Sequence, residues 1–275
     1  MKNLFILLTV CLTLTATMFA ADKGFSFTSD PLLFRPLTAN TFEPRVGLIW
    51  HSNNNRLRLD IGNSIDLLQY NYESPKQRLT IGSDFFTYTQ LSGEKNFHFP
   101  VNAVDYLFGF NANYVDSLES GVLSSRLRLS HISAHFADGH YNGTAGMWKD
   151  GMNPRVYSRE FFDLTVAYEP VISLRAYLGL VYLWHVDPTS LSKFNAYLGG
   201  EYHQPLMSIL DGYAAYQFTV TGLLPRHEFQ AGVKLGSWNG RGTKLFFIYH
   251  AGNSIHGEYH DHRDTFSGVG FNIDF

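Results

Sequence analysis

Residues 264–275 read DTFSGVGFNIDF, and from Gly268 onward apolar residues alternate with small or polar ones. Successive side chains of a β-strand point to opposite faces, so this period of two residues predicts a strand with one apolar and one polar face. The apolar face carries the larger side chains of the stretch, namely Val269, Phe271, Ile273 and Phe275. We expect something outside the chain to cover this face, and lipid is the natural candidate.

The same alternation recurs at short intervals through most of the chain. In residues 56–67, leucine and isoleucine occupy one face while arginine, aspartate and serine occupy the other, and residues 172–184 and 228–235 alternate in the same way. The pattern predicts an all-β fold, an up-and-down antiparallel transmembrane β-barrel of about twelve strands, because bacterial barrels have an even number of strands that alternate between lipid and lumen. The expected strands are residues 45–51, 56–71, 78–91, 101–114, 121–136, 159–169, 172–185, 194–205, 211–221, 226–237, 243–251 and 264–275.

The first residues of the chain are typical of export. Lys2 precedes an apolar run, FILLTVCLTLTATMFA, which has the length and flanks of a signal peptide, so we expect residues 1–21 to be removed. Cys11 lies inside this run, and the mature chain therefore lacks the cysteines that disulfides or thiol chemistry require. Residues 22–44 lack clear periodicity and contain three prolines, which predicts a periplasmic lead-in or a plug before a barrel of residues 45–275.

Composition excludes two classes of protein. A net charge of -3 and a pI near 6.4 argue against a nucleic-acid partner. After the signal peptide no apolar run reaches the roughly 18 residues of a membrane-spanning helix. The aromatic share of 16% with a mean hydropathy of -0.12 fits a barrel, in which only alternate residues meet lipid. A soluble β-sandwich would have a similar composition, so it stays open as an alternative.

Charged residues recur on the faces opposite the apolar ones, where a barrel has its lumen. Both signs are present, so we expect paired charges that fill a narrow lumen rather than a wide pore of one selectivity. The expected lumen-lining residues include Arg126, Arg128, Arg175, Asp105, Asp163 and Glu201.

The strand expected at residues 121–136 carries a row of polar residues on the face that should meet lipid. If no bulge intervenes, His131, Ser133 and His135 share the parity of the lipid-facing leucines before them. A neutral imidazole accepts the proton of a serine hydroxyl as the serine attacks an ester. We therefore interpret Ser133 as a candidate nucleophile, His131 as its base and His135 as a supporting residue. Two non-catalytic interpretations stay open. The three residues could lie at the rim and bond loops or lipopolysaccharide, or a bulge could turn the row inward.

This His-x-Ser pair resembles that of outer-membrane phospholipase and of lipid A deacylase, which hydrolyse acyl esters at the lipid-facing edge of a barrel. In those enzymes an Asn or Glu on the next strand orients the histidine. Here the nearest candidates are Asn142, Asp150 and Glu160, and none has a spacing in the sequence that matches.

A second group of histidines lies in the sequence HGEYHDH, in an expected external loop. His256, His260 and His262, with the neighbouring acids Glu258 and Asp261, have ligand chemistry suited to a divalent metal such as calcium. Loop histidines are more often ordinary polar residues, so the sequence establishes no cofactor.

Several blocks together resemble a bacterial family, the domain of unknown function 1207. They are FRPLTANTFEPR at residues 34–45, AVDYLFG at 103–109, RLRLSHISAH at 126–135, SRE at 158–160 and GNSIHGEY at 252–259. Ala134 replaces the family's usual serine, and Ala137-Asp138-Gly139 replaces its Gly-Asp-Glu. The resemblance implies an envelope protein and supplies no activity.

Two functions remain open on the sequence alone. The first is a non-enzymatic barrel of the bacterial outer membrane, either a narrow pore or a binder of lipid or another ligand. The second is a lipid-facing ester hydrolase acting on phospholipid or lipid A. In either case we expect outer-membrane lipid and lipopolysaccharide as partners, and recognition by the barrel assembly machinery through Phe275, since a terminal aromatic on an alternating strand resembles the C-terminal signature of outer-membrane barrels.

Overall fold

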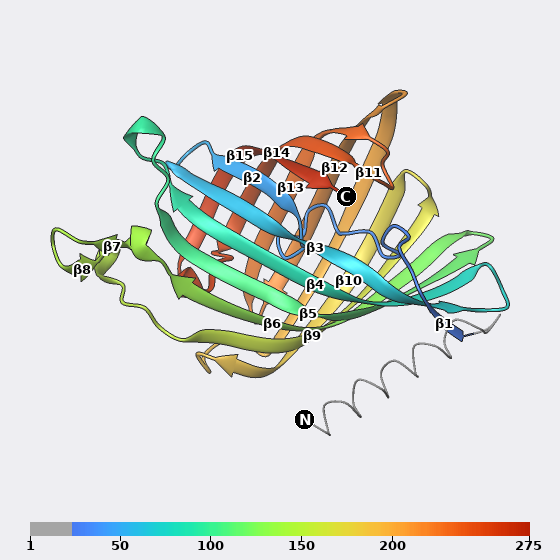
Figure 1. Cartoon of the computed structure of the whole chain (residues 1–275), viewed down its shortest axis with the longest axis horizontal. Helices are drawn as coiled ribbons and strands as arrows, with labels where there is room; N and C mark the ends of the chain where they lie inside the picture. The colour runs from blue at the N-terminus through green and yellow to red at the C-terminus, as the bar shows by residue number, and fades with distance from the viewer. Residues whose placement is uncertain (1–23) are drawn as a thin grey trace, which may run out of the picture.

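The computed structural model describes residues 24–275, and the expected signal peptide, residues 1–21, lies outside the described residues. Twelve antiparallel strands close into one barrel (Figure 1). In chain order they are β2 (Val46–His51), β3 (Arg56–Asn71), β4 (Gln77–Ser92), β5 (Val101–Leu118), β6 (Gly121–Phe136), β9 (Tyr157–Val171), β10 (Leu174–Asp187), β11 (Phe194–Met207), β12 (Leu210–Thr221), β13 (Leu224–Gly236), β14 (Gly242–Asn253) and β15 (Arg263–Asp274). The predicted barrel is confirmed.

The barrel closes where its last strand meets its first. β15 pairs with β2 from Gly268 opposite His51 to Ile273 opposite Val46, and β3 then pairs with both β2 and β4. Every ladder in the ring is antiparallel, so consecutive strands are neighbours throughout. We call the end that carries the C-terminus the C-terminal end, and the opposite end, which carries the longer connections, the loop end.

The two faces of the wall are reversed relative to a soluble protein. On β6 the side chains of Leu127 and Leu129 point outward and are 44% and 42% exposed, whereas Arg126 and Arg128 point inward and are 3% and 2% exposed. Apolar side chains therefore cover the outside and charged side chains the inside. This arrangement excludes the β-sandwich alternative, in which the apolar faces would pack against each other.

A short strand, β1 (Gly24–Phe27), lies within residues 22–44, where the sequence predicted no regular structure. It pairs with the far half of β3, from Gly24 opposite Asn71 to Phe27 opposite Leu68. β2 pairs only with residues 57–60 of β3, so the rest of that edge has free backbone groups. The unpaired NH and C=O groups of such an edge can bond another strand, and β1 forms these bonds with β3.

Between β1 and β2 the chain runs through the lumen as residues 28–45, which we call the plug segment. Phe34 and Leu37 are buried against Tyr177 and Tyr197 of the wall. The Thr41 hydroxyl donates a hydrogen bond to Glu228 at 2.6 Å. The plug segment is thus held by both apolar and polar contacts inside the barrel.

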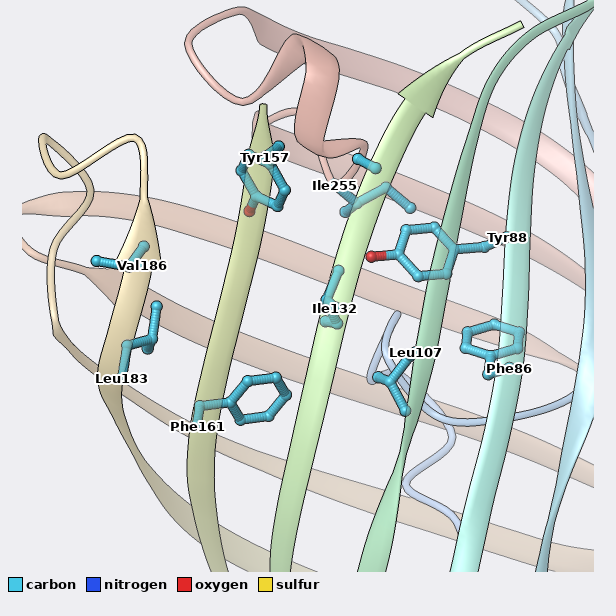
Figure 2. Packing of buried hydrophobic residues seen from close by; sticks show 10 residues of the cluster. Phe86, Tyr88, Leu107, Ile132, Tyr157, Phe161, Leu183, Val186 and Ile255 are labelled. Atoms are coloured by element: carbon cyan, nitrogen blue, oxygen red, sulfur yellow. The ribbon is translucent and has the colours of Figure 1, made fainter. Parts of the chain in front are cut away.

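Two longer connections lie at the loop end, and the second of them packs against inward-pointing side chains of the wall. Residues 137–156 contain the short helices η2 (Asp138–His140) and η3 (Lys149–Gly151) and the hairpin of β7 (Tyr141–Asn142) and β8 (Met147–Trp148). Residues 254–262 contain η4 (Gly257–Tyr259), and a further short helix, η1 (Lys95–Phe97), lies between β4 and β5. Figure 2 shows Ile255 of the second connection packed with inward-pointing side chains of the wall, among them Tyr88 and Ile132. In residues 24–275 no helix is long and apolar enough to cross a membrane.

Candidate functional site

The polar row on β6 faces outward, as its parity predicts. Ile132 and Ala134 are 0% and 1% exposed and point inward, so His131, Ser133 and His135 between and beside them point away from the lumen. The ladders of β6 with β5 and β9 have no register shift, so no bulge turns the row inward. The row lies near the loop end of the strand.

Glu160 of β9 lies directly opposite His131 in the ladder. The Nδ1 atom of His131 is 2.6 Å from Oε1 of Glu160. The second carboxylate oxygen binds Nδ1 of His185, which lies opposite Glu160 on β10. The sequence offered Glu160 only as one candidate without a matching spacing. The structure supplies the acid on the next strand, because strand register rather than distance along the chain places it.

This contact determines which nitrogen of His131 is available for chemistry. A carboxylate at Nδ1 favours the tautomer with the proton on Nδ1, which leaves Nε2 as the acceptor. The side chains of His131 and Glu160 are 26% and 27% exposed, so the pair is accessible from the outer face of the barrel.

Ser133 lies two residues beyond His131 on the same face, at a separation of about 7 Å along the strand. Among residues 24–275 its hydroxyl has no hydrogen-bond partner, His131 included. Catalytic hydrogen bonds are often long until substrate binds. The arrangement therefore has a free hydroxyl, a base with a free nitrogen and an acid that orients the base.

Aromatic and apolar side chains surround the row on the outer face. The Phe108 ring lies 4.9 Å from the His131 ring, and the Tyr106 ring lies 6.1 Å from the His135 ring. Phe108 is 51% exposed, as expected of a residue that meets lipid. An acyl chain in the membrane would reach the row along this apolar surface.

The predicted lumen-lining residues all point inward. Arg126, Arg128, Arg175, Asp105, Asp163 and Glu201 are each at most 7% exposed. The sequence alone did not indicate the partner of two of these residues. Glu43 of the plug segment, 1% exposed, accepts hydrogen bonds from both Arg126 and Arg128. The plug segment has no periodicity that could have indicated this role.

Further contacts join the plug segment to the wall. Arg175 donates a hydrogen bond to the carbonyl of Arg35 at 2.9 Å, and the backbone NH of Thr38 donates to Glu201 at 2.5 Å. Arg126 and Arg175 also lie 4.4 and 4.5 Å from the centre of the Phe34 ring. Charges of the wall are therefore compensated by the plug segment across the lumen.

The three histidines proposed as metal ligands are not brought together. His256 binds Asp105 of the wall at 2.9 Å, His260 binds the carbonyl of Gly257, and His262 binds Asp261. Within the part of the chain that the structure describes, no group of three or more such residues could hold a metal ion. Because the loop folds into the mouth of the barrel, each histidine has a different partner.

Acidic residues of this loop fasten it to its neighbours. Glu258 accepts hydrogen bonds from the backbone NH groups of Phe136 and Arg155, and burial raises the pKa of its carboxyl. The side chain of Arg155 donates to Asp261 at 2.7 Å, and this bonding holds the pKa of Asp261 below its ordinary value. The loop has a structural role in covering the loop end.

Comparison with known proteins agrees with this fold. The model of the family described as "Protein of unknown function (DUF1207)" matches residues 94–275, about two thirds of the chain. No curated protein matches the sequence. Outer membrane phospholipase A from Escherichia coli is similar in structure, with a TM-score of 0.56 and 12% identity over 94% of this chain and 96% of that chain. The β domain of the Bordetella autotransporter BrkA has a TM-score of 0.43 and 15% identity over 84% of this chain and 97% of that chain. At these identities the similarity concerns the fold alone.

Proposed function

The chain belongs to the DUF1207 family, and from the geometry of its own residues we propose that it is an acyl-ester hydrolase of the bacterial outer membrane. Its substrates would be the acyl esters of phospholipid or lipid A. The single observation that carries the proposal is the bond between His131 and Glu160 on the outer face, next to the unbonded hydroxyl of Ser133. Two ionisable side chains on a lipid face are costly unless they pair, and this pair stands beside a nucleophile.

The proposed reaction has two steps. Nε2 of His131 takes the hydroxyl proton while Oγ of Ser133 forms a bond to the ester carbonyl carbon, and the alcohol leaves with that proton. Water then attacks the acyl-serine by the same route and releases the fatty acid. In this proposal Glu160 holds His131 in the required tautomer and stabilises the imidazolium, and we assign to His135 the donation of a hydrogen bond to the oxyanion.

The interior of the barrel supports a lipid-facing activity over a pore. The plug segment crosses the lumen, and Glu43 binds Arg126 and Arg128 there, which narrows any path for a solute. Substrate would instead arrive sideways from the membrane, with the loop end at the cell exterior beside lipopolysaccharide. Assembly into the membrane would use Phe275, which is 64% exposed at the end of β15.

The test is release of fatty acid from phospholipid and from lipid A by the refolded mature chain in detergent, with and without calcium. We expect release that Ser133→Ala and His131→Ala abolish. Glu160→Gln should lower the rate by roughly a hundredfold or more, since a misoriented base loses most of its contribution. Ser125→Ala is the matched control, because Ser125 lies on the same face of β6 near the C-terminal end.

Folding of each variant is checked by its migration in unheated gels. Release that survives Ser133→Ala would reject the assignment of the nucleophile. No release by folded protein from either lipid, with or without calcium, would reject the hydrolase and favour the non-enzymatic barrel.

A further inference from the structure

The lumen contains a cavity between the plug segment and the loop end. It has a volume of about 280 Å³ and is lined by Phe42 of the plug segment, by Arg159, Leu183 and Asn195 of the wall, and by residues of the connections at the loop end. A smaller space of about 60 Å³ continues below it and shares Phe42, Arg159 and Asn195. Figure 2 shows Tyr157, Phe161 and Leu183 pointing into this interior from β9 and β10.

The charge of the cavity is positive. Arg159 forms no ion pair with any of the residues 24–275, and its Nε atom is buried without a hydrogen-bond partner. The wall carboxylate on its side of the lumen, Asp105, already accepts hydrogen bonds from His256 and from the NH of Gly257. Burial of a guanidinium without a counter-ion costs free energy. Binding of an anion next to Arg159 would therefore be favourable.

A second guanidinium faces the same space. Arg226 lies 3.2 Å from Glu228, and its charged group and that of Arg159 lie 5.2 and 4.9 Å from the centre of the Phe42 ring. The Oδ1 atom of Asn195 is also buried without a partner, and a rotated amide would offer its NH₂ group there instead. Two guanidinium groups and one amide, from three strands, therefore line one cavity.

The remaining lining is mixed, with serine, threonine, asparagine and histidine beside the apolar side chains. Leu183, Leu191 and Ile255 face the cavity together with the Phe42 ring. Its volume corresponds to about nine water molecules at about 30 Å³ each, which suits a small organic molecule rather than a macromolecule or a bare ion.

We propose that this cavity binds a small monocarboxylate with an apolar body, its carboxylate between Arg159 and Arg226 and its body against Leu183, Leu191 and Ile255. Guanidinium groups bind a planar carboxylate through paired hydrogen bonds, and the apolar side chains of the lining would contact the body of the acid. The inference is independent of the proposed hydrolase, because Ser133 and His131 face the outside of the barrel and the cavity lies within it.

The experiment is calorimetric titration of the full mature barrel in a non-ionic detergent. The probes are octanoate, which represents acids derived from lipid, and phenylacetate, which represents free aromatic acids. Binding of either acid supports a site for a carboxylate with an apolar body. The relative affinity of the two acids shows whether an alkyl chain or an aromatic ring fits better. Octanol is the uncharged control and should bind at least about tenfold more weakly, as expected for loss of a charged hydrogen bond.

Two variants probe the site independently. Arg159→Met should weaken acid binding by about tenfold or more, since it removes the guanidinium and keeps only an unbranched chain as far as the position of Nε. Leu191→Trp keeps both charges and fills the cavity, and it should also abolish binding. Arg78→Met, at an exposed position near the C-terminal end, should leave binding unchanged. The proposal is overturned if neither acid binds, if octanol binds as well as octanoate, or if folded Arg159→Met binds as tightly as the unsubstituted chain.

Discussion

Replacing Glu43 by Gln should destabilise the barrel more than any other single amide substitution of a carboxylate in the plug segment. Glu43 accepts two hydrogen bonds from Arg126, one of them 2.9 Å long, and one of 2.8 Å from Arg128. Removal of one partner from a buried ion pair costs about 3–5 kcal/mol, because the other charge stays buried without compensation. We expect the lower part of this range, since Arg128 retains Asp84 at 3.0 Å.

The free energy of unfolding is measured by urea titration of the protein in lipid vesicles. A loss of about 3 kcal/mol should lower the urea midpoint by about 1 M or more. The exposed loop substitution Glu94→Gln serves as the control and should leave the midpoint unchanged. The double variant Glu43→Gln with Arg126→Met should be more stable than the sum of the two single losses predicts, because it removes charge from both sides. A midpoint for Glu43→Gln equal to that of Glu94→Gln would refute the reasoning.

Two further predictions concern the connection of residues 254–262. Burial raises the pKa of Glu258 above its ordinary value of 4.5, so its contribution to folding of the loop is complete below that value and is lost as pH rises through the raised pKa. Hydrogen exchange of the loop, corrected for intrinsic rate, should therefore be slower near about pH 4 than near about pH 7, and Glu258→Gln should remove this difference. A Cβ atom at Gly257 would lie 2.3 Å from Tyr157 and 2.7 Å from Ala134, so Gly257→Ala should displace the loop and speed its proteolysis. Gly143→Ala, which meets no atom within 4 Å, should not change the rate, and equal rates for both variants would contradict the packing seen here.

The strands of the barrel could be predicted because each of them shows the alternation of apolar and polar residues within its own sequence. On β15, Val269 and Phe271 must face lipid whatever the rest of the chain does, and the period of two residues follows from that requirement. The same rule placed His131 and Ser133 outside and Arg126 inside. Properties that depend on one strand alone are readable from the sequence.

Contacts between two segments that lie far apart in the chain could not be predicted from the sequence. Glu160 meets His131 only because β9 returns beside β6 in one particular register after the long connection of residues 137–156. Glu43 lies far from Arg126 and Arg128 in sequence, and an aperiodic segment gives no indication of its depth in the lumen. The contacts of Glu160 with His131 and of Glu43 with the two arginines were therefore visible only in the three-dimensional arrangement.

The attachment of the plug segment limits how it can move. Its two ends continue into β1 and β2, and both of these strands are bonded to the same edge of β3. A segment anchored twice to one wall strand cannot be expelled from the barrel as a separate body, and any widening of the lumen must come from rearrangement within residues 28–45.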